Sequence, residues 1–286
     1  MARRKSFGRR RAALVVSGAT FGALATIVAY AAGTAPTPPR PTPARPAVKA
    51  APELKPYVEN VPGSLATFEM IPVPAPPGGK PFWIARTETT WDAFDVFAYG
   101  LDRGVEAKAA VVDAISRPSK PYGAPDRGFG HQGFPALAMT YLAAEQYCRW
   151  LTAKTGKTYR LPTVAEWEWA ARAGNKLPAA ALPAADLEKM AWYWDTTEEG
   201  TRAVGSKAAN PWGLHDMLGN VAEWCTVPGG EPVVSGGSWK DKRENVHPGA
   251  REKQTPAWNQ NDPQNPKSKW WLSNGEFVGF RVVREP

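Results

Sequence analysis

The chain has 286 residues, 43% of them hydrophobic, so it is long enough to bury a sizeable core in one or two domains. Six of the positive charges behind its formal net charge of +8 precede the first apolar run, at Arg3, Arg4, Lys5, Arg9, Arg10 and Arg11. Subtracting these six leaves +2, with no basic stripe in the rest of the chain, which argues against a nucleic-acid partner. With 13 Trp, 26 Gly and 29 Pro, the composition predicts a loop-rich, irregular fold.

The N-terminus has the layout of an export signal. An uncharged run, Ala12–Ala32, follows the basic residues and contains the small-residue site Ala29-Tyr30-Ala31, as in a secretory signal peptide. Its 21 residues are also enough to span a bilayer, so an uncleaved N-terminal anchor is the competing interpretation. Either interpretation of residues 1–32 predicts an exported protein of the periplasm or cell envelope.

Residues 33–64 are rich in Pro and Ala. Such a composition buries little apolar surface and favours extended polyproline II. We therefore expect a linker that holds the folded part away from a membrane, followed by one folded domain over residues 65–286.

The folded domain is expected to begin with two strands, FEMIPVPAP from Phe68 and PFWIARTETT from Pro81. Thr90 can then cap a helix whose apolar face holds Phe94, Phe97, Ala98 and Leu101. Residues 116–133 are rich in Pro, Gly and charge, which predicts a long surface loop.

Two stronger helices follow. The first has Thr140 as its cap and Gly156 as its stop, with one apolar face made by Ala144, Tyr147, Cys148 and Leu151. The second opens with a capping box, Thr163 and Glu166, and ends at Gly174. Residues 179–188 are an Ala and Pro insert, VVSGGSWKD predicts a strand, residues 242–273 form a polar segment, and EFVGFRVVRE predicts a closing strand.

The stretch Asn210–Cys225, NPWGLHDMLGNVAEWC, combines turn formers, carboxylates and indoles. Gly213 and Gly219 allow backbone conformations closed to other residues, while Asp216 and Glu223 flank a run of carbonyls. This pattern is typical of a rigid loop around a hard cation. An N-cap Asp and a surface Glu beside a tight turn are the alternative interpretation.

Four phrases in order then carry a resemblance: YCRWLTAKTGKTYRLPTVAEWEWAARAG, NPWGLHDMLGNVAEWC, VVSGGSW and VGFRVVRE. Together they resemble the formylglycine-generating enzyme family, also called sulfatase-modifying factors, from about residue 65 to residue 285. The resemblance implies a single α+β domain with an irregular C-type-lectin-like fold and low regular secondary structure. It also implies a structural calcium ion, held by the side chains of Asp216 and Glu223 and the carbonyl oxygens of Gly219 and Val221.

Departures from the family pattern bear on the chemistry. The resemblance implies two copper-binding cysteines a few residues after the GGSW-like phrase, where oxygen is activated to oxidise a substrate cysteine. Asp241 and Val246 stand near those positions, and neither is the soft ligand that copper(I) prefers. A family Trp beside the calcium-binding Glu is also replaced, by Ala222. We therefore expect no copper and no copper-dependent formylglycine formation.

The resemblance implies a variable, ligand-binding surface between GGSW and GFRV. Its candidate contacts are Ser238, Trp239, Asp241, Arg251 and Trp258, which suit a polar ligand such as a peptide or glycan. A solvated loop with buried indoles is the alternative. We expect an exported recognition or accessory module.

Other functions stay open, and so does the question whether the chain is an enzyme at all. A divergent periplasmic oxidoreductase or tailoring enzyme would use Asp241, His247 and Arg251 as its first catalytic candidates. A structural subunit of an envelope complex is a further alternative. Cys148 and Cys225 lie in apolar contexts, so buried thiols are expected, and a disulfide between them stays open.

Overall fold

Five strands pair into one sheet, in the order β1-β2-β3-β9-β4. These strands are β1 (Tyr57–Asn60), β2 (Thr67–Val73), β3 (Phe82–Ala85), β4 (Tyr159–Arg160) and β9 (Val283–Arg284). All their pairings are antiparallel. The C-terminal strand therefore lies between β3 and β4 and joins the two ends of the domain.

A second sheet has the order β7-β6-β5-β8. It consists of β5 (Ala222–Cys225), β6 (Val233–Ser235), β7 (Arg251–Lys253) and β8 (Val278–Gly279). Strands β5 and β8 run parallel, and the other pairs are antiparallel. This sheet places the GNVAEW and VVSGG phrases side by side.

The computed structural model describes residues 54–102, 115–121 and 123–286, which belong to one compact unit, Ala51–Pro286. The expected signal or anchor at residues 1–32, and most of the expected linker, lie outside these residues. Within the part that the structure describes, no helix is long and apolar enough to cross a membrane.

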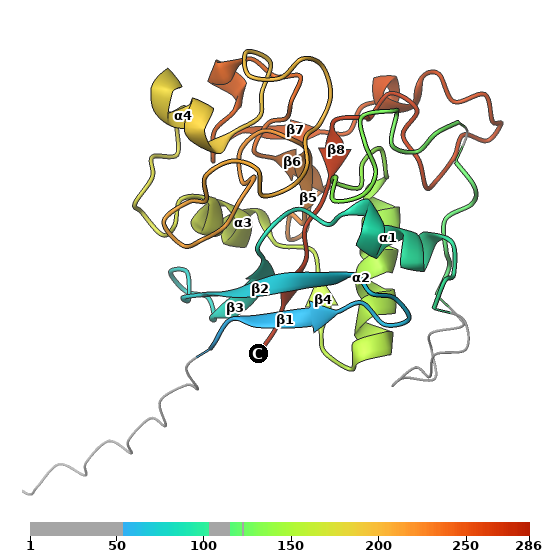
Figure 1. Cartoon of the computed structure of the whole chain (residues 1–286), viewed down its shortest axis with the longest axis horizontal. Helices are drawn as coiled ribbons and strands as arrows, with labels where there is room; N and C mark the ends of the chain where they lie inside the picture. The colour runs from blue at the N-terminus through green and yellow to red at the C-terminus, as the bar shows by residue number, and fades with distance from the viewer. Residues whose placement is uncertain (1–53, 103–114, 122) are drawn as a thin grey trace, which may run out of the picture. The chain divides into compact units, whose positions relative to one another are not determined.

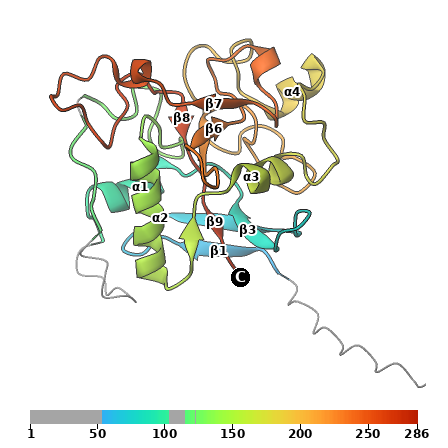
Figure 2. The same cartoon turned by 180° about the vertical axis from the view of Figure 1, so that it is seen from behind.

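The helices lie on two sides of the sheets. They are α1 (Trp91–Ala98), α2 (Tyr141–Thr155), α3 (Val164–Ala171) and α4 (Ala184–Met190), with 3-10 turns at Arg243–Asn245 and Pro256–Asn259. Figures 1 and 2 show α1 and α2 together on one side of the domain and α3 and α4 on the other. The mixture of short helices and strands confirms the expected α+β class with low regular content.

Local capping explains where α2 begins and ends and where α3 begins, whereas α3 ends at Ala171, before the expected Gly174. The Thr140 hydroxyl accepts the Ala143 amide, and Gly156 takes a left-handed conformation with φ of 71° at the end of α2. Thr163 and Glu166 form the expected capping box of α3. The expected starts of both helices are therefore confirmed. They could be predicted because the residues that signal them are close together in the sequence.

Aromatic rings fill the space between these helices and the strands. Trp91, Phe94, Tyr147 and Phe280 are fully buried, and the ring centroids of Phe94 and Phe280 lie 5.9 Å apart. Such rings supply buried apolar area that strands of two to seven residues cannot. The two sheets and α2 therefore meet in one aromatic core.

The expected start of the folded domain and the expected end of the first helix were wrong. Strand β1 lies within residues 33–64, so the folded domain begins earlier than residue 65. The inward-facing residue of β1 is Glu59, whose carboxylate accepts a bond from Lys157 Nζ at 2.6 Å. Leu101 is 60% exposed because α1 ends at Ala98. The insert at residues 179–188 contains the start of α4, whose buried contact is the single side chain of Leu187.

The closing phrase EFVGFRVVRE does not form one strand. Val278–Gly279 pairs with β5 in the second sheet, and Val283–Arg284 pairs with β3 and β4 in the first. The intervening residues, which include Arg281, pass through the interior between the sheets, where Arg281 has no exposed surface. The chain thus carries a charged side chain into the core at this crossing.

Candidate functional site

The loop before β5 has a tightly constrained backbone. Gly219 has a φ of 74°, and a Cβ atom there would lie 2.1 Å from the carbonyl oxygen of Trp192. Asp216 and Asn220 also have positive φ values, 53° and 52°, which are unfavourable for residues with a side chain. The loop is therefore built for one conformation, as the glycines in this stretch predicted.

Beneath this loop lies a group that we call the buried cluster: Glu88, Asp216, Glu223 and Arg281. Each of the four is at most 2% exposed. Arg281 Nε donates to Glu223 Oε2 and Arg281 Nη2 donates to Glu223 Oε1, each at 2.6 Å. The indole of Trp167 donates to the same Oε2 at 2.7 Å. The Glu223 carboxylate is thus an internal acceptor and not the surface group of the alternative interpretation.

The other two members of the buried cluster, Asp216 and Glu88, are both acidic, so Arg281 is the one cationic side chain in this group of four. Asp216 Oδ2 accepts the Gly205 amide at 2.6 Å, whereas its buried Oδ1 has no partner. Glu88 accepts the Val221 amide and the Asn220 side-chain amide, at 2.9 and 2.7 Å. Burial, reinforced for Glu88 by the charges of Asp216 and Glu223, raises the pKa of both Glu88 and Asp216.

Three buried carboxylates around one guanidinium leave two negative charges uncompensated when all are ionised. Protons can compensate them, and so can a divalent cation. The unpaired Oδ1 of Asp216, within a loop that also carries the Gly219 and Val221 carbonyls, fits the hard oxygen donors that calcium prefers. Among the described residues, no group of three or more His, Cys, Asp or Glu side chains forms a metal site by itself. Backbone oxygens would therefore have to complete the coordination.

On the other side of β5 is an open hollow of about 400 Å³, which we call the cleft. Asp241, Asn245, His247, Ala250, Arg251 and Glu252 are among the residues that line it. The structure thus brings together all three of the catalytic candidates, Asp241, His247 and Arg251, from the polar segment that follows β6.

Each of these three side chains is anchored to its surroundings. Asp241 Oδ2 accepts from the Ser238 amide and hydroxyl, at 2.8 and 2.6 Å. Arg251 donates to Glu168 at 3.1 Å and to two backbone carbonyls, and burial lowers the pKa of its guanidinium. His247 Nδ1 lies 3.0 Å from the Ala179 carbonyl oxygen. A carbonyl only accepts, so this nitrogen carries the proton.

The remaining ligand-contact candidates lie in the interior. Ser238 is fully buried beneath Asp241. Trp239 is 9% exposed and packs edge-on against Phe129. Trp258 is 5% exposed and packs against Trp224 and Phe277. Neither indole lines the cleft, so their assignment as ligand contacts stays a prediction.

Both cysteines are free and buried. Burial raises the pKa of the Cys225 thiol to about 12 and raises that of Cys148 as well. Neither cysteine lines the cleft. The thiolate that would bind a soft metal or attack a substrate is therefore disfavoured at both positions.

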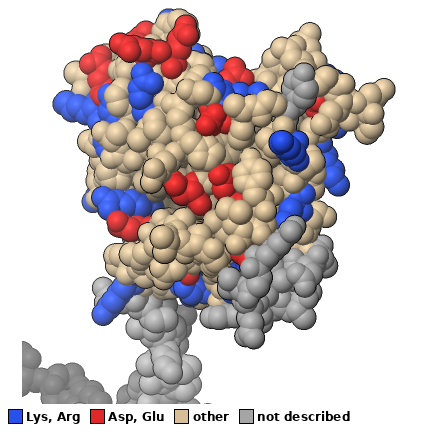
Figure 3. Space-filling view, turned by 45° about the vertical axis from the view of Figure 1, so that its right-hand side comes forward, with Lys and Arg blue, Asp and Glu red and all other residues tan. Residues whose placement is uncertain are grey.

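Sequence analysis missed Arg281 and Glu88, the two charged residues that enclose Glu223. A signal was present for the first, because Arg281 interrupts the apolar run VGFRVV, and a lone charge within a buried strand needs a buried partner. Glu88 lies in ARTETTW and carries no comparable signal. Figure 3 shows acidic and basic side chains interspersed over one face of the domain.

The comparisons with known proteins agree with this architecture. The formylglycine-generating enzyme of Mycobacterium tuberculosis is 37% identical over 122 residues, 37% of this chain and 38% of that protein. The inactive C-alpha-formylglycine-generating enzyme 2 of Bos taurus is 32% identical over 124 residues, 38% of this chain and 39% of that protein. These alignments span less than half the length of either relative.

A solved structure extends the likeness to the fold. PvdO from Pseudomonas aeruginosa superposes with a TM-score of 0.56 at 22% identity, covering 82% of this chain and 100% of that chain. The expected irregular α+β fold is thereby confirmed. The family model of the sulfatase-modifying factor enzyme 1-like domain matches residues 75–286, which is more than half of the chain. The chain therefore belongs to the sulfatase-modifying factor enzyme 1-like family.

Proposed function

We propose that this chain is an exported recognition or accessory module that binds a polar ligand, a peptide or a glycan, without copper-dependent formylglycine chemistry. The observation that carries the proposal is the cleft itself. It is lined by ionisable and amide side chains, and no cysteine lies among its described walls. A hollow of this kind can hold a polar ligand without a soft metal.

The side chains of the cleft support binding better than turnover. The bonds from Ser238 hold one oxygen of Asp241, and the contact with Ala179 holds one ring nitrogen of His247. The opposite atoms, Asp241 Oδ1 and His247 Nε2, make no hydrogen bond within the described part of the chain. One acceptor atom on each side chain is thus held in place for a ligand donor.

A copper assay tests the absence of redox chemistry. The full-length protein is incubated with copper(I) and a cysteine-containing peptide, and the peptide mass and bound copper are measured. We expect neither a change in peptide mass nor stoichiometric copper. Thiol labelling serves as the control, because Cys148 and Cys225 are buried and should react only after unfolding. Conversion of the peptide cysteine would overturn the proposal.

A binding assay tests the recognition role. Arrays of peptides and of glycans are probed with the wild-type protein and with His247→Ala, which removes a ring that lines the cleft. We expect binding that falls with the variant and persists in Lys253→Gln, a control at an exposed position of β7. Binding that survives His247→Ala unchanged would place the ligand elsewhere.

We propose further that calcium is held structurally at the loop before β5. Asp216 and Glu223 would supply carboxylate oxygens, and Gly219 and Val221 would supply carbonyl oxygens. The support is the unpaired buried Oδ1 of Asp216 and the charge imbalance of the buried cluster. The ion would stabilise a strained loop and take no part in ligand chemistry.

A second candidate function is a divergent tailoring enzyme of the same family. The specific observation in its favour is that Asp241, His247 and Arg251 line one cleft, where an acid, a base and a cation can act on one substrate. Turnover of a bound array ligand, detected by its change in mass and lost in both His247→Ala and Asp241→Asn, would favour this enzyme over the recognition module.

Export and anchoring are proposals as well, supported by the uncharged run Ala12–Ala32 behind its basic flank. Cell fractionation and N-terminal mass spectrometry test both. A soluble exported chain that lacks residues 1–32 indicates a cleaved signal, an intact membrane-bound chain indicates an anchor, and cytoplasmic protein contradicts export.

A further inference from the structure

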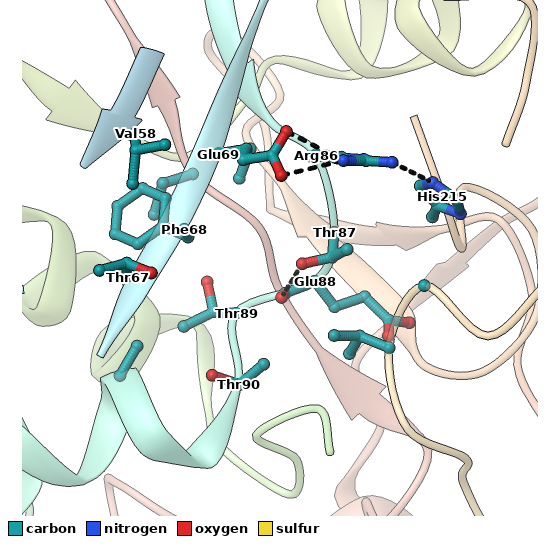
Figure 4. A pocket seen from close by; sticks show the side chains of 15 residues that line it. Val58, Thr67, Phe68, Glu69, Arg86, Thr87, Glu88, Thr89, Thr90 and His215 are labelled. Atoms are coloured by element: carbon teal, nitrogen blue, oxygen red, sulfur yellow. Dashed lines mark hydrogen bonds and ion pairs between the residues drawn. The ribbon is translucent and has the colours of Figure 1, made fainter. Parts of the chain in front are cut away.

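A second cavity of about 360 Å³ lies apart from the cleft. It is enclosed by β2, by the segment that joins β3 to α1, and by the loop that carries His215 (Figure 4). It shares no lining residue with the cleft. Its volume falls within the range of about 300–1,000 Å³ for small-molecule sites.

Hydroxyl groups from two segments surround this space. Thr67 belongs to β2, whereas Thr89 and Thr90 precede α1, and all three line the cavity. In Figure 4 the hydroxyls of Thr67 and Thr89 face the space between them. Thr89 is only 8% exposed, yet no hydrogen bond involves its hydroxyl within the described residues. Thr90 occupies the N-cap position without a side-chain capping bond.

Two of the charged groups of the cavity, Glu69 and Arg86, compensate one another. Arg86 Nη1 donates to both oxygens of Glu69 at 2.9 Å. Arg86 Nη2 lies 3.2 Å from Nε2 of His215, whose Nδ1 lies 2.8 Å from the Lys207 carbonyl oxygen. Because arginine only donates and a carbonyl only accepts, this imidazole accepts at Nε2 and donates at Nδ1. These bonds compensate the charges of Glu69 and Arg86. The other carboxylate of the wall, Glu88, accepts the Val221 amide and the Asn220 side-chain amide in the buried cluster.

Part of the wall is apolar, with Phe68, Val204 and Val282 among its residues, and Thr87 and Glu88 also line it. The floor is fixed, because the Thr89 amide donates to the Phe280 carbonyl at 2.9 Å and the Thr89 carbonyl accepts the Ala136 amide at 2.8 Å. Free hydroxyls beside an apolar wall match a ligand that has hydroxyls on its edge and C–H groups on its face. A fixed floor lowers the ordering cost of binding.

We propose that this cavity binds a neutral, polyhydroxylated molecule the size of one sugar ring. The hydroxyls of Thr67, Thr89 and Thr90 would exchange hydrogen bonds with the hydroxyls of the ring, and the Glu69 and Arg86 pair would contact its edge. This second site is independent of the ligand proposed for the cleft.

Saturation-transfer NMR titrations of the full-length protein test the proposal. The probes are D-glucose, D-galactose, N-acetylglucosamine and myo-inositol as neutral ligands, with glucose 6-phosphate and glucosamine as charged ones. At least one neutral probe should bind with a Kd on the order of 1 mM. Thr89→Val, which keeps the shape of the side chain and removes the hydroxyl, should weaken this binding about 5-fold.

Three further variants control the experiment. Thr67→Val changes an exposed residue of β2 and should also weaken binding. It keeps the proposal testable if Thr89→Val disturbs the fold. Thr201→Val removes a buried hydroxyl that has no hydrogen-bond partner and does not line the cavity, so binding should not change. Asp241→Asn should also leave it unchanged. The proposal is overturned when no neutral probe binds, when a charged probe binds more tightly, or when Asp241→Asn alone abolishes binding.

Discussion

Ala222 and Glu223 are neighbours in β5, and the two sides of this strand differ in what they do with charge. Ala222 lines the open cleft, whereas Glu223 lies in the buried cluster with no exposed surface. Acidic residues occur on both sides. In the cluster, both carboxylate oxygens of Glu223 accept bonds from Arg281, whereas in the cleft only Oδ2 of Asp241 accepts internal bonds.

The difference separates two roles for the same chemistry. A fully buried ion pair is costly to break, because the partner that remains is an unpaired charge in the interior. A half-exposed carboxylate loses little when changed, because water replaces its partners. Charge in the cluster therefore specifies the fold, and charge in the cleft is available to ligands.

The largest effect should come from Arg281→Met, which leaves Glu223 buried without its ion-pair partner. We expect a loss of about 3–5 kcal/mol in the free energy of unfolding, measured by urea denaturation. Arg251→Met is the matched arginine variant in the cleft, where the guanidinium is 19% exposed, and it should cost about 1–2 kcal/mol.

The double variant Glu223→Gln/Arg281→Met keeps the first prediction testable when the single variant folds poorly. Removing both charges should recover part of the loss, because no unpaired ion remains. Equal losses for Arg281→Met and Arg251→Met would erase the distinction between the two sides of β5.

Calcium should give the next largest effect. After chelation, adding calcium at about 100 times its Kd should stabilise the protein by about 2.7 kcal/mol, seen as a rise in Tm. Asp216→Asn removes the unpaired carboxylate and should abolish the rise, whereas Glu231→Gln, at an exposed side chain, should retain it. A Tm that is unaffected by calcium in the wild-type protein contradicts the calcium proposal.

Much of this comparison could be predicted from local sequence. The capping box at Thr163, the glycine stop at Gly156 and the constrained turn at Gly219 each depend on residues close together in the chain, and each occurs as expected. Glu223 is buried, which agrees with the interpretation of this stretch as a rigid loop and not with the alternative of a surface Glu. Local rules therefore sufficed for the starts of α2 and α3, for the end of α2 and for the constrained turn before β5, but not for the ends of α1 and α3.

The partners of these residues could not be predicted in the same way. Glu223 and Arg281 are 58 residues apart, and Glu88 meets Asn220 across 132 residues. Strand β1 was missed because its inward side chain is Glu59, which breaks the apolar alternation that marks a strand. The cavity at Thr89 depends on hydroxyls from β2 and from the segment before α1, which only the folded chain brings together.

Asp241→Asn tests the cleft side of the comparison with a smaller change. The amide oxygen can still accept from Ser238, but it loses the charge that strengthens the bonds to the Ser238 amide and hydroxyl. We expect a loss of about 1 kcal/mol in the free energy of unfolding. Glu223→Gln, the same acid-to-amide change in the cluster, should cost several times more in the same urea titration. A reversed order would assign the structural role to the cleft.

The smallest expected effect concerns a third group of charges, around His131 on the α1 side of the domain. His131 Nε2 lies 2.7 Å from Asp95 Oδ2, and Nδ1 lies 3.2 Å from Asp126 Oδ2. Burial opposes the charged ring, but the hydrogen bonds and charges of the two carboxylates outweigh it and raise the pKa of His131 above 6.5. Burial also raises the pKa of Asp95.

The sign of the pH dependence follows from the raised pKa of His131. Its contribution to stability is fully present below the unfolded value of 6.5 and is lost as pH rises through the higher folded value. Because the side chain is 41% exposed, solvent screening keeps this contribution below about 1 kcal/mol. The difference in Tm between weakly acidic and weakly alkaline buffer should therefore be smaller in His131→Gln than in the wild-type protein. Lys253→Gln, at an exposed position of β7, is the control and should keep the wild-type pH dependence. A pH profile unchanged by His131→Gln would show that a half-exposed pair of this kind contributes nothing to folding.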